Sequence, residues 1–114
     1  MVIEITGIVG RTRTEPERAV VGLGETVRWV VRAGASGVKS VEWQVYFSHG
    51  SPFKERSWKL TTEGGSENDA EHAGVIDAGE TQQPGEYKYG VRAVDASTNQ
   101  EISDDDPFLI VQSR

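Results

Sequence analysis

Cysteine is absent from this chain of 114 residues. Disulfide bonds, thiol nucleophiles, cysteine-ligated zinc and blue-copper sites are therefore excluded, while the redox compartment stays open. Long apolar runs are also lacking, because none approaches the roughly 20 residues that a transmembrane helix needs. Residues 1–5 do not resemble a signal peptide, since they have no basic start, long apolar stretch or small-residue cleavage site. We expect a soluble protein without membrane contact, and the sequence favours no particular localisation.

Positive charge is scarce and unevenly distributed. The chain has 12 Lys and Arg against 18 Asp and Glu, which gives a net charge of -6. Residues 1–60 carry a net charge of +3, whereas residues 61–114 contain three basic and twelve acidic residues and carry -9. Because nucleic-acid binding depends on clustered positive charge, the acidic balance argues against nucleic acid as a partner.

The length and composition fit one folded domain. A chain of this size buries roughly two-thirds of its unfolded surface, which is enough for a core without metal or disulfide crosslinks. Trp, Phe, Tyr, Val and Ile recur in blocks rather than being diluted among charges, so the composition is not typical of disorder. We expect a single domain over residues 1–114, and we expect it to be a monomer.

Three segments alternate apolar and polar residues with the period of two that is typical of half-buried strands. The odd positions are apolar in residues 26–33, 40–47 and 87–93, and in the last segment Lys88 and Arg92 fall on the other face. This alternation favours antiparallel strands with one face on a core. The expected core consists of the inward residues Val27, Trp29, Val31, Val41, Trp43, Val45, Tyr87, Tyr89 and Val91.

Shorter stretches complete the predicted strands. No segment has a sustained helical period, so we expect almost no helix. Residues 62–71 are polar and contain Gly64 and Gly65, which predicts a mobile surface loop. Glycine-bearing turns separate the strands at the spacing of a sandwich. The additional strands are expected over residues 3–9, 19–21, 56–61, 73–77 and 107–111.

Residues 84–89, with the sequence Pro-Gly-Glu-Tyr-Lys-Tyr, resemble the approach to strand F of immunoglobulin domains. In this resemblance Tyr87 takes the tyrosine-corner position and Tyr89 the position of the second cysteine. Trp43 is similar to the core tryptophan of strand C, and Trp29 lies about where the first cysteine would be. The C-terminal segment also resembles small bacterial proteins of immunoglobulin-like or cupredoxin-like shape. The resemblance implies an all-β fold, an antiparallel Greek-key β-sandwich of immunoglobulin-like type with about seven to nine strands.

The titratable residues favour no metal site. A cupredoxin-type copper site needs a thiolate besides two histidines, so we expect His49 and His72 to be exposed loop residues. Asp104, Asp105 and Asp106 offer oxygen ligands for calcium, but they lack calcium-loop spacing, and consecutive strand residues point in opposite directions. We expect an acidic solvated turn that keeps the last strand from pairing with other chains, with calcium binding as the alternative.

Catalytic motifs are also lacking. The sequence has no defensible Ser–His–Asp order and no glycine-rich phosphate loop followed by a helix. Among the twelve acidic residues of the second half, some carboxylates are expected to lie near each other by chance. We therefore expect a protein that is not an enzyme and that uses no cofactor.

Aromatic side chains remain as candidates for a binding site. Tyr46 falls on the outward face of its predicted strand, and Phe53 and Trp58 lie in a segment with several basic residues. Exposed aromatic faces serve as hot spots for protein partners or stack on sugar rings; alternatively, Phe53 and Trp58 complete the core. We expect a non-catalytic interaction or structural module that binds a protein partner, with a carbohydrate-binding module as the alternative.

Overall fold

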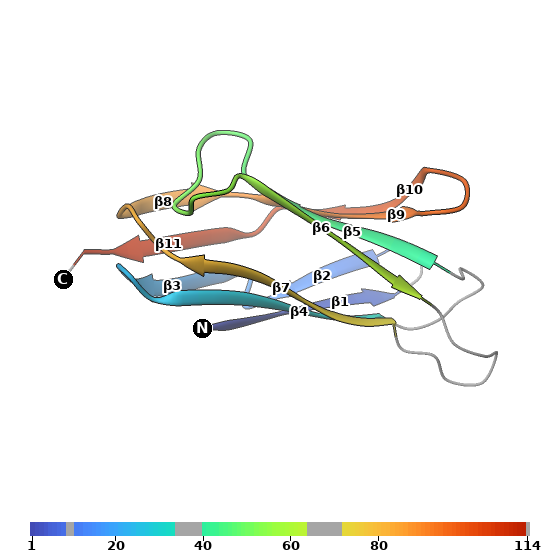
Figure 1. The fold of residues 1–114 in the computed structure, drawn as a ribbon, viewed down its shortest axis with the longest axis horizontal. Helices are drawn as coiled ribbons and strands as arrows, with labels where there is room; N and C mark the ends of the chain where they lie inside the picture. Colours follow the sequence, from blue (N-terminus) through green and yellow to red (C-terminus); the bar gives the residue numbers. More distant parts are fainter. Residues whose placement is uncertain (9–10, 34–39, 64–71, 114) are drawn as a thin grey trace.

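The computed structural model describes residues 1–8, 11–33, 40–63 and 72–113 (Figure 1). Within these ranges the chain is all-β and has no helix, as expected, so no membrane-spanning helix is found there. The expected loop at 62–71 lies outside the described residues from position 64 onward. The strands are β1 (Val2–Ile8), β2 (Arg11–Glu15), β3 (Arg18–Gly22), β4 (Thr26–Ala33), β5 (Ser40–Tyr46), β6 (Ser57–Glu63), β7 (His72–Glu80), β8 (Gly85–Lys88), β9 (Gly90–Asp95), β10 (Gln100–Asp105) and β11 (Phe108–Gln112).

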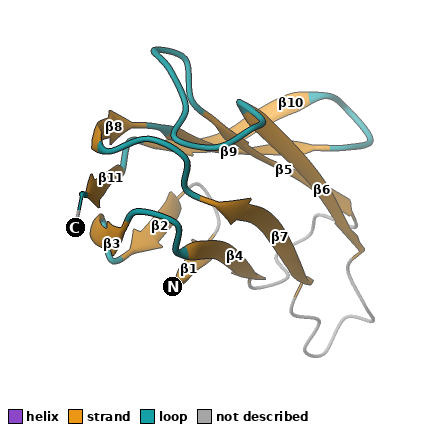
Figure 2. Ribbon diagram, turned by 60° about the vertical axis from the view of Figure 1, so that its left-hand side comes forward, coloured by secondary structure: helices purple, strands orange, loops and turns teal. Residues whose placement is uncertain are grey.

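The strands form three sheets. Their orders are β2-β1-β4-β7, β10-β9-β5-β6 and β3-β11-β8. Figure 2 shows the first sheet facing the second across the interior, so that the molecule has the layered arrangement of a β-sandwich. The molecule is elongated along the strands, with extents of 48 × 22 × 19 Å.

One long hairpin joins the second and third sheets. Only Tyr89 separates β8 from β9, and only Asp106 and Pro107 separate β10 from β11. β8 pairs with β11, whereas β9 pairs with β10 and β5. Pro107 interrupts the hydrogen bonding between strands, because proline has no N–H to donate. Its carbonyl accepts the N–H of Tyr89 at 3.1 Å, so the two interruptions lie opposite each other. Both strands of the hairpin therefore change sheets at the same level.

The expectation of a purely antiparallel sandwich is wrong for two strand pairs. β1 runs parallel to β4, with Ile3 opposite Trp29, and β3 runs parallel to β11, with Ala19 opposite Leu109. The chain reverses between β1 and β2 and again between β3 and β4, so β4 returns in the direction of β1. Two of the three sheets are consequently mixed, and only the β10-β9-β5-β6 sheet is purely antiparallel.

The expected number of strands is also too low, since the described residues form eleven. β2 and β10 were not predicted, and the predicted strand at 87–93 is divided by its change of sheet. The expectation of an acidic turn at 104–106 is wrong for two of its three residues. Asp104 and Asp105 are the last residues of strand β10, and only Asp106 lies in the connection to β11. Strand pairing with β9 extends this segment where its composition indicated a turn.

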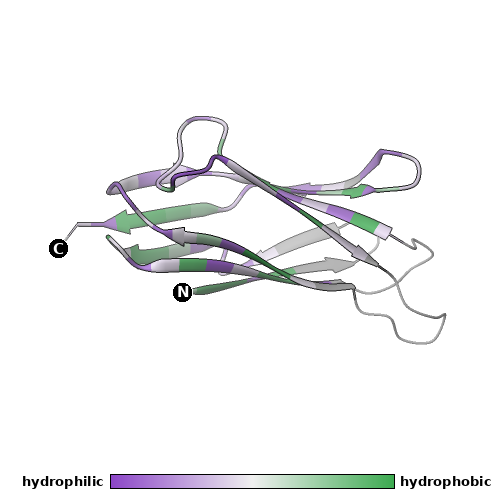
Figure 3. Cartoon of the chain, in the orientation of Figure 1, coloured by the Kyte–Doolittle hydropathy of each residue, from purple (hydrophilic) through white to green (hydrophobic). Residues whose placement is uncertain are grey.

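The core agrees closely with the alternation of the sequence. All nine expected core residues are buried except Tyr87, which is partly buried and packs against the others. Figure 3 shows apolar and polar residues alternating along β4. Ile3, Ile5 and Leu109 add fully buried side chains from the first and last strands. The two layers thus meet across a single apolar core.

Aromatic rings fill one part of this core. The Trp29 ring lies 5.5 Å from that of Tyr89 and 5.7 Å from that of Trp58, while Phe47 stacks on Tyr89 at 4.9 Å. Phe53 packs edge to face against Trp29 and Trp58 at 6.0 and 5.5 Å. Rings from both layers therefore interlock, which adds directional contacts to the burial of apolar area.

Two buried hydrogen bonds fix the tryptophans. The Trp29 indole Nε1–H donates to the Tyr89 hydroxyl oxygen at 3.1 Å, which links β4 of one layer to the residue between β8 and β9 of the other. Burial raises the pKa of Tyr89 and keeps this phenol neutral. The Trp43 indole donates to Thr62 Oγ1 at 2.9 Å, and Thr62 donates in turn to the Val41 carbonyl. Each buried indole therefore has a partner.

We expect Tyr89→Phe to lower the free energy of unfolding by about 1 to 3 kcal/mol, because it leaves the buried Trp29 N–H without an acceptor. Urea denaturation followed by fluorescence measures the loss. Tyr46→Phe is the matched control, since its hydroxyl bonds to Asp104 at the surface, and its effect should stay within about 0.5 kcal/mol. Equal effects of the two substitutions would contradict the role of the buried bond.

Candidate functional site

Polar side chains of strands β5 and β9 lie on the outer face of their sheet, opposite the face that packs on the core. Because Val41, Trp43 and Val45 point inward, the alternating residues Gln44 and Tyr46 point outward. The register places Gln44 opposite Arg92 and Tyr46 opposite Gly90. Cross-strand neighbours share one face, so these side chains meet on the outside of the sandwich.

Tyr46 spans three strands of its sheet. A Cβ at Gly90 would overlap the Tyr46 ring, which shows that the ring lies directly over the glycine backbone. Beyond it, the Tyr46 hydroxyl donates to the Asp104 carboxylate on β10, at 3.2 Å to Oδ2. Burial raises the pKa of Tyr46, and the charge and hydrogen bond of Asp104 raise it further. The phenol is therefore held in one orientation across β9.

Arg92 lies beside this ring. Its Nη2 donates to Gln44 Oε1 at 2.6 Å, and its guanidinium carbon is 6.0 Å from the centre of the Tyr46 ring, within cation–π range. The Arg92 Nε is buried and has no hydrogen-bond partner. No carboxylate in the described part of the chain forms an ion pair with Arg92.

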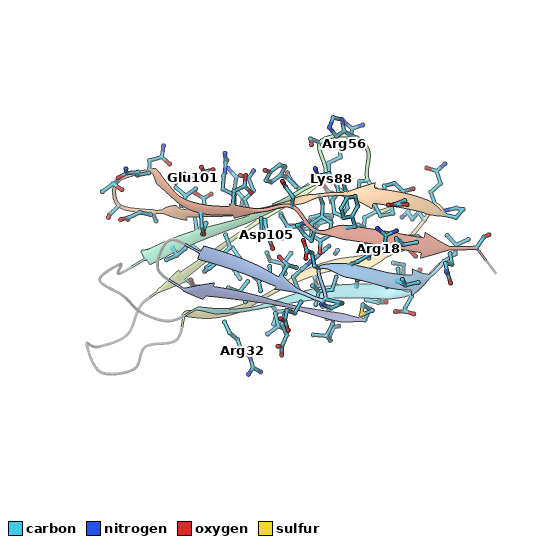
Figure 4. The ribbon with its side chains drawn as sticks, turned by 180° about the vertical axis from the view of Figure 1, so that it is seen from behind. Arg18, Arg32, Arg56, Lys88, Glu101 and Asp105 are labelled. Atoms are coloured by element: carbon cyan, nitrogen blue, oxygen red, sulfur yellow. The ribbon has the colours of Figure 1, made fainter. Side chains whose placement is uncertain are left out.

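A hollow of about 360 Å³ opens next to Arg92 and Tyr46. The exposed Arg56 borders it from the loop after β5, and the backbone of that residue is fixed by a 2.8 Å bond from the Phe47 N–H to its carbonyl. Figure 4 shows Arg56 on the opposite side of the molecule from Arg32. The lining contains two arginines and no carboxylate: Gln44, Tyr46, Phe47, Ser48, Arg56, Ser57 and Arg92.

A second hollow, of about 580 Å³, lies where the edge strands β6 and β7 approach each other. Trp58 is its aromatic wall, and its polar lining includes Asp77, Glu80 and Gln82. Trp58 is only partly buried, although its ring packs on the core. Asp77 is paired with Arg28 across β4 and β7 at 3.3 Å.

The three aromatic residues singled out in the sequence do not lie together. Tyr46 is half-buried on the outer face of β5. Phe53 is 6% exposed and belongs to the core. Trp58 lies opposite Val45, so it points to the inner face and reaches solvent only at the sheet edge. Each therefore has its own surroundings, and only Tyr46 lies on the outer face of the sheet.

The acidic residues of β10 serve contacts within the fold. Asp104 accepts the Tyr46 hydroxyl, whereas Asp105 Oδ2 accepts the Thr14 N–H at 2.9 Å and so joins β10 to β2 of the other layer. The two neighbouring carboxylates thus face opposite sides, as strand geometry requires. The described residues contain no group of three metal-ligating side chains.

The histidines take two positions. His49 is exposed after β5, as expected. The expectation that His72 lies in a loop is wrong, because His72 begins β7, where it pairs with Ala33; its side chain lies outside the described part.

The sequence analysis did not single out Arg92, Gln44 or Arg56. Alternation already assigned Gln44 and Arg92 to outward faces. Alternation does not reveal the register between β5 and β9, and this register places Gln44 opposite Arg92 rather than opposite another residue of β9. The position of Arg56 depends on how the loop after β5 folds back on Phe47.

No protein-family model matches the chain, and no curated protein sequence matches it.

We expect Gly90→Ala to destabilise the protein by about 1 to 3 kcal/mol, because the new methyl group displaces the Tyr46 ring. In a Tyr46→Ala background the same change should cost much less, since no ring has to move. Denaturation of the four proteins of this double-mutant cycle measures the coupling. An identical cost of Gly90→Ala in both backgrounds would show that the ring does not lie over the glycine.

Proposed function

We propose that this protein is a non-catalytic module that binds a protein partner on the outside of strands β5 and β9. The binding surface, called here the β5–β9 face, consists of Gln44, Tyr46, Arg56, Ser57 and Arg92. The observation that carries the proposal is the hollow of about 360 Å³ at its centre, bordered by a fixed tyrosine and two arginines.

The residue types and their preorganisation support this function. Tyrosine and arginine are enriched at protein interfaces and dominate their binding energy. Tyr46 is already held by Gly90 and Asp104, and Arg92 by Gln44, so a partner orders few side chains when it docks. Lower ordering entropy leaves more of the contact energy as affinity.

An immunoglobulin-like fold is the finer architecture that we propose. The Tyr87 hydroxyl donates to the Gln83 carbonyl at 3.1 Å, as a tyrosine corner does in such sandwiches. Trp29 and Tyr89 meet between the layers at the positions suggested for the two cysteines, and Trp43 is buried in β5. The fold by itself does not imply an activity, so the binding proposal rests on the face.

Carbohydrate binding is a second candidate, and the hollow beside Trp58 favours it. An aromatic ring next to carboxylate and amide groups, as Trp58 is to Glu80 and Gln82, offers stacking and hydrogen bonds to a sugar. Trp58 also packs on Trp29 and Phe53, so it has a structural role that needs no ligand.

Protein binding is tested with a photo-crosslinking amino acid placed at Ser57, which is exposed at the rim of the hollow. In extracts of the native cells, we expect the Ser57 probe to form a discrete crosslinked product. The same probe at Glu4, exposed on β1 of the other sheet, should not form that product. Matching products from both positions, or none from Ser57, would rule out the β5–β9 face as the docking surface.

Carbohydrate binding is tested by calorimetry with neutral oligosaccharides of glucose, xylose and N-acetylglucosamine. If the second hollow is a sugar site, Trp58→Phe should weaken binding about tenfold by reducing the stacking surface while retaining core contacts. Tyr46→Phe should leave it unchanged. Absence of heat with all three sugars, or unchanged affinity in Trp58→Phe, would eliminate this candidate.

A further inference from the structure

The hollow on the β5–β9 face has the opposite charge to the protein as a whole. The chain carries a net charge of -6, yet Arg56 and Arg92 border the hollow without a carboxylate among its lining residues. Three cations elsewhere on the described surface have carboxylate partners: Arg18 pairs with Glu86 at 3.4 Å, Arg28 with Asp77 at 3.3 Å, and Lys59 lies 3.6 Å from a carboxylate on β5. A local excess of positive charge therefore stands out against acidic surroundings.

Arg92 is incompletely satisfied in the free protein. Gln44 accepts one bond from Nη2, and the buried Nε donates none. Asp104 lies opposite Arg92 in the register, but its carboxylate bonds to Tyr46. A partly desolvated guanidinium without a carboxylate in direct contact is stabilised when an anion approaches its accessible end.

We propose that this hollow binds a carboxylate from an acidic segment of the protein partner, with Arg92 and Arg56 as its counter-ions. The inference rests on the proposed protein-binding function and specifies the chemistry of the partner. A planar guanidinium donates parallel bonds to a carboxylate. Ser48, Ser57 and Gln44 supply neutral polar groups around it.

Charge complementarity supports an acidic segment as the occupant. The protein carries a net charge of -6, so a hollow lined by two arginines and no carboxylate is a local point of attraction for an acidic segment and sets the register of docking. The Tyr46 ring beside Arg92 adds an apolar surface for the methylene groups of a glutamate side chain. Electrostatic attraction of this kind weakens as salt increases.

The test uses capped hexaglutamate as the probe and arginine Nε NMR signals as the readout, at low ionic strength. We expect a saturable shift of the Arg92 Nε–H signal and of the Gln44 side-chain amide. Arg92→Gln and Arg56→Gln should each weaken binding about tenfold, the loss of one charge-assisted contact. Arg28→Gln removes the same charge from the other sheet and should leave binding unchanged.

Several outcomes would overturn the inference. These are the absence of a saturable shift at Arg92, an equal loss of affinity in Arg28→Gln, and inorganic phosphate binding at Arg92 as tightly as hexaglutamate. Arg56 is exposed in a loop, so Arg56→Gln keeps the test valid if Arg92→Gln fails to fold. If the Ser57 crosslink to a protein partner persists in Arg92→Gln and Arg56→Gln, the carboxylate inference fails while the proposed function stands; if wild type gives no crosslink, the function itself fails.

Discussion

The buried contact between Trp29 and Tyr89 is the interaction on which the rest of the structure depends. A chain without cysteine has no disulfide cross-link between its layers, so noncovalent contacts hold them in register. The Trp29 indole reaches across the interior to the tyrosine at which β8 becomes β9, and the surrounding rings fill the space between the layers. The hydrogen bond adds a directional requirement that apolar packing alone does not impose.

The same contact determines what the outside of the sheet presents. Tyr89 is the point at which one hairpin strand leaves β11 and joins β5, and Gly90 follows it directly. Because Tyr89 is anchored inward, Gly90 lies beneath Tyr46, and Arg92 follows two residues later on the same face as Gln44. The packing of Tyr89 in the core and the position of Arg92 at the hollow therefore both follow from the same register between β5 and β9.

Sequence alone accounts for the core but not for the way the strands are connected. Alternation assigned Val27, Trp29 and Val31 to one buried face, since period-two patterns depend only on local geometry. β2, which reads Arg-Thr-Arg-Thr-Glu, has no apolar residue to reveal it, and its pairing with β1 depends on long-range contacts. For the site, alternation placed Tyr46 and Arg92 outward, but their meeting depends on register between strands distant in sequence.

Hydrogen exchange of the three tryptophan indole N–H groups, followed by NMR in heavy water, tests the central claim most directly. Trp29 and Trp43 donate to buried hydroxyl groups, so their signals should persist long after that of Trp58, which lines a surface hollow. Trp58→Phe identifies the third signal. Two slowly exchanging indoles and one rapid one would support the account, whereas exchange of the Trp29 indole as fast as that of Trp58 would contradict it.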